Sequence, residues 1–246
     1  MFESRFAMAL MVACGASLWA GADAQAAVLF EDNFEATTTV PGAPDAPQAG
    51  VYPGGSESPE SLVVAAGGSH PASPAAGSHI LNTTGKDRNY GDFVSPATGT
   101  GILTYEFDAR LDGSSDNNFG IFGDGSITTL DGNALGVWLR LASNGVVYSF
   151  NGGWVDTTLD HAIGQWQHYV IEYELGGSTF DLTAGATTVS VNMAGAMSQV
   201  DGVMFGQGGT NSTNGYTDNV VASFVPEPSS LALASMGLVL AYRRRS

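Results

Sequence analysis

The sequence has few basic residues: 8 of its 246 residues are Lys or Arg, against 24 Asp and Glu, which gives a formal net charge of −16. Between residues 27 and 225, four basic residues stand against 21 acidic ones, a net charge of −17. Proteins that bind nucleic acids through phosphate contacts need an excess of Lys and Arg. The charge therefore excludes a nucleic acid as a partner.

Cysteine is almost absent, since Cys14 is the only one. A disulfide or a cysteine-based zinc site needs partner thiols, so both are excluded. The four histidines show no His-Glu-x-x-His spacing, and a Gly-x-Ser-x-Gly nucleophile elbow is also lacking. The sequence thus gives no support to a metalloprotease or an esterase.

A complete pair of catalytic carboxylates is lacking too. The segment Glu106-Phe107-Asp108-Ala109-Arg110-Leu111 resembles the Glu-x-Asp-x-x-Glu motif of laminarinase-like hydrolases, whose two glutamates are nucleophile and acid, but Leu111 replaces the second glutamate. Glu172 and Glu174 are two residues apart on a predicted strand, about 7 Å, near the separation of retaining glycosidases. Neighbouring acids on an acidic protein are usually only solvated. We therefore expect no enzymatic activity.

The N-terminal segment has the features of a signal peptide. One cation, Arg5, precedes an apolar run over residues 6–20, and Ala24-Gln25-Ala26 fits the small-residue cleavage pattern. We predict a signal peptide over residues 1–26, cut after Ala26 by signal peptidase, with cleavage after Ala24 as the second choice. The protein is therefore expected to be exported.

The C-terminal segment joins three features. Pro226-Glu227-Pro228 leads into an apolar run over residues 231–242, which is followed by Arg243, Arg244 and Arg245. The prolines end the preceding strand, the apolar run can enter a bilayer, and the arginines stay cytoplasmic by the positive-inside rule. About a dozen apolar residues reach only ~18 Å of the ~30 Å hydrocarbon core, which suits a transient anchor better than a permanent one.

This tail, residues 225–246, resembles the PEP-CTERM sorting signal of Gram-negative bacteria that export surface polysaccharide. The resemblance implies that an exosortase, a membrane cysteine protease, cuts near the motif. The precursor would then be held in the inner membrane for a time, before the body passes to the cell surface or the extracellular matrix. A C-terminal core helix that happens to end in arginines is the alternative interpretation.

Between the two ends, apolar residues recur with the period of two that is typical of strands. Residues 101–111 place Leu103, Tyr105 and Phe107 on one face, and residues 165–175 place Tyr169, Ile171 and Tyr173 on one face. Residues 134–142 have an apolar face of leucine and valine, with Trp138 and Arg140 on the opposite face. Asn144-Gly145 then marks a hairpin turn, after which Val146, Tyr148 and Phe150 continue the alternation. Further strands are predicted over residues 61–66, 119–122, 178–183, 187–193, 202–206 and 216–224.

Ten or more short strands separated by Gly, Asn and Asp turns predict an all-β fold. We expect residues 27–224 to form one two-sheet antiparallel jelly-roll sandwich, with a long surface loop over residues 36–61. Residues 29–35, 164–170 and 216–221 resemble the first, middle and last strands of concanavalin A-like and laminin G-like jelly rolls. The resemblance implies that the first and last strands are neighbours.

An aspartate interrupts the apolar face of each terminal strand. Asp32 alternates with Phe30 and Phe34, and Asp218 alternates with Tyr216 and Val220. Two buried carboxylates on neighbouring strands repel one another unless a cation lies between them, and calcium prefers oxygen ligands. We predict a structural calcium at Asp32 and Asp218, as the jelly-roll resemblance also implies. The alternative is that the strands bend here and both aspartates cap turns.

Binding is the better-supported class of function. Carbohydrate sites stack sugar rings on aromatic faces and fix hydroxyls with polar side chains. Trp138 and Arg140 on one outer face, and Trp154 in a loop over residues 151–156, offer such groups. We expect a non-catalytic module that binds or organises extracellular polysaccharide; the alternatives are a structural matrix protein without a defined sugar ligand and a divergent glycan hydrolase.

Overall fold

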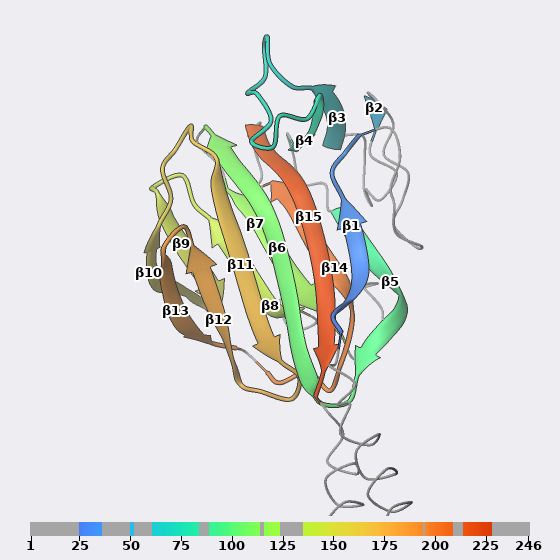
Figure 1. The fold of residues 1–246 in the computed structure, drawn as a ribbon. Coiled ribbons are helices and arrows are strands. Elements are labelled where there is room, and N and C mark those ends of the chain that lie inside the picture. The colour runs from blue at the N-terminus through green and yellow to red at the C-terminus, as the bar shows by residue number, and fades with distance from the viewer. Residues whose placement is uncertain are drawn as a thin grey trace, which may run out of the picture. The chain divides into compact units, whose positions relative to one another are not determined.

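In the computed structural model, residues 25–35, 50–51, 61–83, 89–113, 116–123, 135–193, 195–208 and 214–227 are described. Within these residues the regular elements are strands, and residues Ala26–Val225 form one compact unit (Figure 1). The predicted signal peptide lies almost wholly outside the described residues, as do the apolar run and the arginines of the tail. No helix in the described part of the chain is long and apolar enough to cross a membrane.

The strands form two antiparallel sheets. The nine-stranded sheet has the order β13 (Thr187–Asn192), β12 (Thr179–Ala184), β11 (Gln167–Glu174), β6 (Gly101–Asp112), β15 (Asn214–Pro226), β4 (His79–Thr83), β3 (Ser61–Ala65), β2 (Gly50–Val51), with β1 (Ala27–Asp32) also paired to β15. The six-stranded sheet has the order β10 (Trp154–Asp160), β9 (Val146–Phe150), β8 (Leu135–Leu141), β7 (Asn117–Phe122), β14 (Gln199–Gly208), β5 (Asn89–Thr98).

The chain crosses between the sheets repeatedly, for example from β4 to β5, β5 to β6 and β6 to β7. The prediction of an all-β, two-sheet jelly-roll sandwich is thereby confirmed. The first and last strands are neighbours, as expected: Ala27 lies opposite Phe224 in the β1–β15 pair, and the two strands run side by side in Figure 1.

The core lies between the sheets and consists of the residues that the period of two placed inward. Leu103, Tyr105, Phe107, Ala109 and Leu111 of β6 are all at most 1% exposed. Phe107 stacks on Phe119 of the opposite sheet with ring centroids 4.1 Å apart. Burying large aromatic side chains across both sheets is the main stabilising contribution that a sandwich of this kind can have.

The predicted hairpin is present, but its second strand has the opposite face inward. Leu141 lies opposite Val147 and Leu139 opposite Ser149, so Val147 and Ser149 of β9 point to the core and are at most 1% exposed. Tyr148 and Phe150 consequently lie on the outer face. The sequence also did not predict β4, β5 or β10, or β2, which lies within the predicted surface loop over residues 36–61. Trp154 begins a strand rather than lying in a loop.

Candidate functional site

The three predicted ligand contacts come together on the outer face of the six-stranded sheet. Trp138 and Arg140 lie on β8, and Trp154 lies on β10, with β9 between the two strands. The Trp138 and Trp154 rings meet edge to face at 5.0 Å, and the Arg140 guanidinium carbon is 5.3 Å from the Trp154 ring centroid. These are distances of aromatic and cation–π contact.

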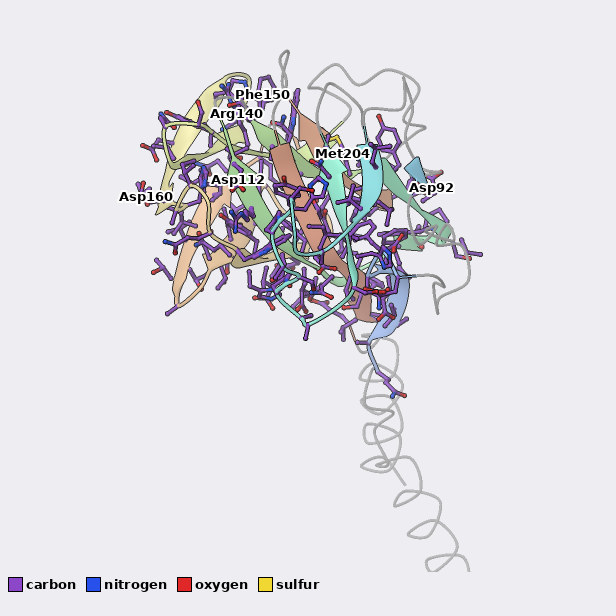
Figure 2. All side chains as sticks on the ribbon, turned by 90° about the horizontal axis from the view of Figure 1, so that it is seen from above. Asp92, Asp112, Arg140, Phe150, Asp160 and Met204 are labelled. Atoms are coloured by element: carbon purple, nitrogen blue, oxygen red, sulfur yellow. The ribbon has the colours of Figure 1, made fainter. Side chains whose placement is uncertain are left out.

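Two residues of β9, which the sequence placed inward, complete this group. Phe150 lies opposite Trp154 in the β9–β10 pair and is 5.4 Å from Trp138, while Arg140 is 6.0 Å from the Tyr148 ring. We call Trp138, Arg140, Tyr148, Phe150 and Trp154 the aromatic platform. The register of the hairpin could have predicted that Tyr148 shares the outer face with Arg140, because it sets the two residues opposite each other. Figure 2 shows Arg140 and Phe150 together, with Met204 and Asp92 lying farther toward the opposite edge.

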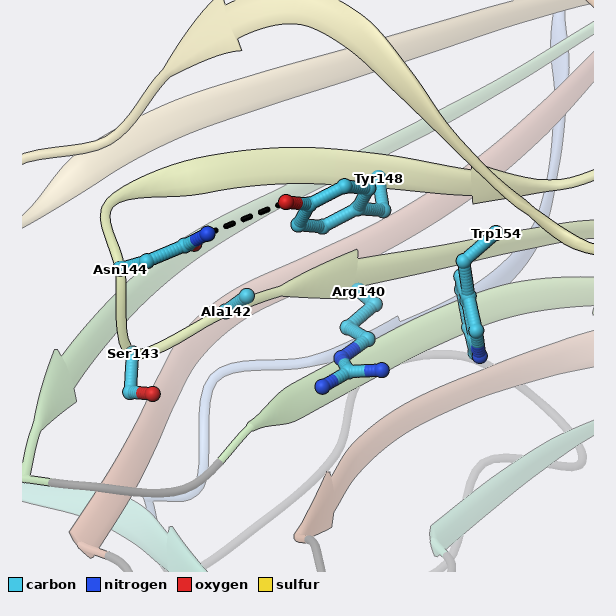
Figure 3. Close-up of a pocket in the computed structure, with 6 residues that line it drawn as sticks. All are labelled: Arg140, Ala142, Ser143, Asn144, Tyr148 and Trp154. Atoms are coloured by element: carbon cyan, nitrogen blue, oxygen red, sulfur yellow. Dashed lines mark hydrogen bonds between the residues drawn. The ribbon is translucent and has the colours of Figure 1, made fainter.

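A shallow pocket of about 260 Å³ opens on the platform and is lined by Arg140, Ala142, Ser143, Asn144, Tyr148 and Trp154 (Figure 3). Its volume is slightly below the usual ~300–1,000 Å³ of small-molecule sites. The β8–β9 turn shapes one wall: Asn144 Nδ2 donates to the Tyr148 hydroxyl at 3.0 Å, and Asn144 Oδ1 accepts the Val146 N–H at 3.1 Å. Gly145 adopts the positive φ of 84° that this turn needs.

The charge of Arg140 is matched within the site. One guanidinium nitrogen of Arg140 lies 2.7 Å from Asp116 Oδ2, and both side chains are partly exposed, at 32% and 21%. The pair fixes the guanidinium against the Trp154 ring while leaving no net charge there. The pocket therefore offers a fixed aromatic face and hydrogen-bonding groups without a strong electrostatic preference.

The structure separates the two aspartates of the predicted calcium site. Thr217 lies opposite the core residue Leu81, and Val220 is also a core residue, so the alternation breaks between them. The break is at Asn219, which has a φ of +50°. Asp32, opposite Val220, is on the core face of β1, whereas Asp218 is on the outer side. The sequence analysis placed Asp218 on the same face of its strand as Val220, and this placement is wrong.

Each of these aspartates accepts a local backbone hydrogen bond. Asp32 Oδ1 accepts the Phe34 N–H at 2.7 Å, and Asp218 Oδ1 accepts the Asn219 N–H at 2.9 Å. These contacts agree with the turn-capping alternative. In the part of the chain that the structure describes, no group of three or more His, Cys, Asp or Glu side chains is arranged for a metal ion. Calcium binding itself stays a prediction.

Asp218 lies under the loop of residues 66–78, which covers one end of the outer face of the nine-stranded sheet. Ser73 Oγ donates to Asp218 Oδ2 at 2.7 Å, and Trp166 Nε1 donates to the carbonyl of Ala72 at 2.7 Å. Burial, with repulsion from Asp108 and Glu35, outweighs the hydrogen bonds from Ser73 and Asn219 and raises the pKa of Asp218 to about 7. We call Trp166, Tyr216 and Asp218, with the loop over them, the loop-covered region.

Glu35 holds the end of the same loop. Partial burial alone would raise its pKa, but hydrogen bonds from Ser78 and His79 outweigh this effect and lower the pKa of Glu35 to about 2. Glu35 Oε1 accepts the backbone N–H groups of Ser78 and His79 at 2.6 and 2.9 Å. Two neighbouring carboxylates thus have pKa values moved in opposite directions.

The incomplete hydrolase motif lies on the outer face of the nine-stranded sheet. His168 Nδ1 is 2.9 Å from Asp108 Oδ1, and His168 Nε2 is 3.6 Å from Glu106 Oε2. Asp108 also accepts a hydrogen bond from Asn219 Nδ2 at 2.7 Å, which helps to hold the bend in β15. Glu172 and Glu174 are exposed on β11 of this face.

The end of β15 leads directly into the tail. Phe224 is the last core residue, Pro226 ends the strand, and Pro226 and Glu227 are exposed. A family model of the PEP-CTERM protein-sorting motif matches residues 224–246. The tail is a PEP-CTERM sorting motif. It marks the protein for export and for processing at the membrane by an exosortase, and it includes Pro226, Glu227 and Pro228 and the basic end Arg243, Arg244 and Arg245.

The solved structures that match this chain are only distantly similar to it. A sialidase has 11% identity and a TM-score of 0.46 over 58% of this chain and 15% of its own. Lectin II from Ulex europaeus has 9% identity and a TM-score of 0.45 over 59% of this chain and 87% of its own. An alginate lyase of polysaccharide lyase family 7 has 14% identity and a TM-score of 0.39 over 67% and 78%. No curated protein sequence matches the chain.

Proposed function

We propose that the exported body is a non-catalytic module that binds polysaccharide at the aromatic platform. The observation that carries this proposal is the convergence of Trp138, Trp154, Tyr148 and Phe150 around Arg140 on one outer face. The faces of tryptophan and tyrosine rings stack on the apolar faces of sugar rings, and a fixed guanidinium donates to hydroxyls.

The pocket suits part of a chain better than an enclosed small molecule. Its volume of about 260 Å³ holds about one sugar ring, and the platform extends beyond it to Trp138 and Phe150. Ser143 and Asn144 at its rim bear a hydroxyl and an amide, which are groups that bind sugar hydroxyls. A polymer would thus place one residue in the pocket and its neighbours along the platform.

The sorting motif supports export of the body to a place where it could meet such a polymer. We propose that the processed body lies at the cell surface or in the extracellular matrix of a Gram-negative bacterium and organises the polysaccharide exported there. The −17 charge of residues 27–225 would keep such a body solvated, or let cations bridge it to a matrix.

The test is affinity electrophoresis of the exported protein through native gels that contain single polysaccharides, both neutral and acidic. The parent should be retarded by at least one of them, and Trp154→Ala should lose about 2 kcal/mol of binding, roughly thirtyfold in Kd. The neighbouring Val155, which is 53% exposed, gives the matched control: Val155→Ala should bind as the parent does.

Two other outcomes would replace the proposal. A parent protein that no polysaccharide retards would favour a structural matrix protein. Release of reducing ends from a retarding polysaccharide, lost in Glu106→Gln or Glu172→Gln, would show a divergent glycan hydrolase.

A further inference from the structure

We propose that β13 pairs with β13 of a second copy of this chain, so that the nine-stranded sheets of the two copies continue into one another. An edge strand presents unpaired N–H and C=O groups, and proteins protect such edges with charge, proline, bulges or short length. The edges of this sandwich differ sharply in that protection.

Four of the edge strands that the structure describes carry such protection. β2 has only two residues. β1 bears Glu31 and Asp32 and has a register shift between Val28 and Phe30. β5 bears Asp92 and Pro96, and its pairing with β14 is also shifted. β10 bears Asp156 and Asp160, with a shift between them at Thr158, whose φ is +67°.

β13 has none of these protective features. Thr187–Asn192 pair with β12 over all six residues without a register shift, and no described strand pairs with the other edge of β13. Residues 182–200 contain no Asp, Glu, Lys, Arg or Pro. Thr187, Thr188, Ser190 and Asn192 are exposed.

The strand is also complementary to itself. Val189 and Val191 are partly buried and pack against the core, while Ser190 points outward between them. In an antiparallel pair, residues opposite one another share a face. A two-fold axis at Ser190 therefore sets Val189 opposite Val191 of the other copy twice, with Thr188 opposite Asn192 and the two Ser190 residues opposite each other.

The lack of charge on β13 permits a second copy as the occupant, although the body as a whole is strongly acidic. Two bodies of net charge −17 repel one another at any contact that brings their carboxylates together. Pairing about Ser190 sets the five uncharged residues Thr188–Asn192 of each copy against the same five, so no carboxylate of these strands is buried. Most closed oligomers are two-fold dimers of this isologous kind.

Pairing at β13 would also set two carbohydrate sites side by side, a consequence that rests on the proposed function. β10, which bears Trp154, lies next to β13 along the same edge of the sandwich (Figure 1). A two-fold axis perpendicular to the sheets keeps both platforms facing the same way. Two linked sites that reach one polymer bind it more tightly than either site alone.

The first test is cross-linking, because Cys14 is the only cysteine and the predicted signal peptide contains it. Cα atoms opposite one another in an antiparallel pair are ~4.5–5.5 Å apart, within the range of a disulfide. Ser190→Cys in the exported protein should therefore form a covalent dimer on mild oxidation. Ser95→Cys on the exposed edge of β5 is the matched control and should stay monomeric.

The second test is the mass of the full chain in detergent by light scattering. The parent and Ser95→Asp should have twice the mass of the chain, whereas Ser190→Asp, which sets two carboxylates opposite each other, should be monomeric and should still unfold in one cooperative transition. A monomeric parent, or a Ser190→Asp protein that stays dimeric, would overturn the proposal. If polysaccharide binds, Ser190→Asp should weaken retention at least about tenfold; absence of binding in every variant would overturn the proposed function but not the dimer.

Discussion

The aromatic platform and the loop-covered region both gather aromatic and charged side chains on an outer face, but on opposite sheets and with opposite exposure. On the platform, Arg140 and Trp154 line an open pocket. In the loop-covered region, the loop of residues 66–78 lies over Asp218, which is 2% exposed. The difference teaches that similar residues stay available to a ligand where the surface is open and stabilise the fold where the chain itself covers them.

Asp218→Asn should have the largest effect in this comparison. Its pKa of about 7, against an ordinary 3.8, means that the folded state holds the proton more tightly than the unfolded state. The parent should therefore lose stability as the pH rises from about 4 to 7, on the order of 4 kcal/mol, with no further loss above that range. Asp218→Asn, which imitates the protonated acid, should abolish this loss. Chemical denaturation at pH 4, 6 and 8 measures this loss. If the free energy of unfolding changes equally with pH in both proteins, the pKa of Asp218 is not raised by burial.

Trp166→Ala should lower stability without affecting polysaccharide binding, which would distinguish the loop-covered region from the aromatic platform. Trp166 donates to Ala72 and packs 6.5 Å from Tyr216, so its loss should cost about 3 kcal/mol of stability. Polysaccharide binding per folded molecule should not change, the reverse of Trp154→Ala. Thermal unfolding and affinity electrophoresis on the same samples test this; loss of binding with unchanged stability in Trp166→Ala would make the loop-covered region a second ligand site.

The predicted calcium would change the loop-covered region from a self-contained contact to a metal-dependent one. At an ion concentration of 100 times Kd, calcium should add about 2.7 kcal/mol of stability. Asp32→Ala and Asp218→Ala should each lose that gain. Identical unfolding with calcium and with chelator would show that this fold binds no calcium and would leave the local hydrogen bonds of Asp32 and Asp218 as their structural contribution.

Glu35→Gln should have the smallest effect and the opposite pH dependence to Asp218→Asn. Because the pKa of Glu35 is lowered from 4.5 to about 2, its stabilisation is full above pH 4.5 and is lost as the pH falls toward 2. Its side chain is 31% exposed, so solvent screening reduces the expected cost at pH 7 to about 1 kcal/mol. The difference between parent and variant should vanish at pH 2; a variant destabilised equally at every pH would show a purely steric contribution.

The sequence predicted the fold well because a sandwich core follows from strict alternation, as in β6. The prediction of which face points inward failed where a bend interrupts the alternation or where both faces of a strand bear apolar residues. Asn219 turns the chain at a positive φ, so Asp218 changes sides, and nothing in the residue type alone requires that bend. In β9 a buried Ser149 displaces Tyr148 and Phe150 to the surface, because the register of β8 and not hydrophobicity selects the inner face.

The pairing of β1 with β15 also bears on the time at which the sandwich folds. Ala27 and Phe224 come from opposite ends of the body, so this contact closes the longest loop that the domain contains. Contacts of such sequence separation form slowly and late. A chain that crosses a membrane from its N-terminus delivers β15 last, so the sheet cannot close while translocation is under way. The order of the strands thus leaves the nine-stranded sheet incomplete until nearly all of the body has been exported.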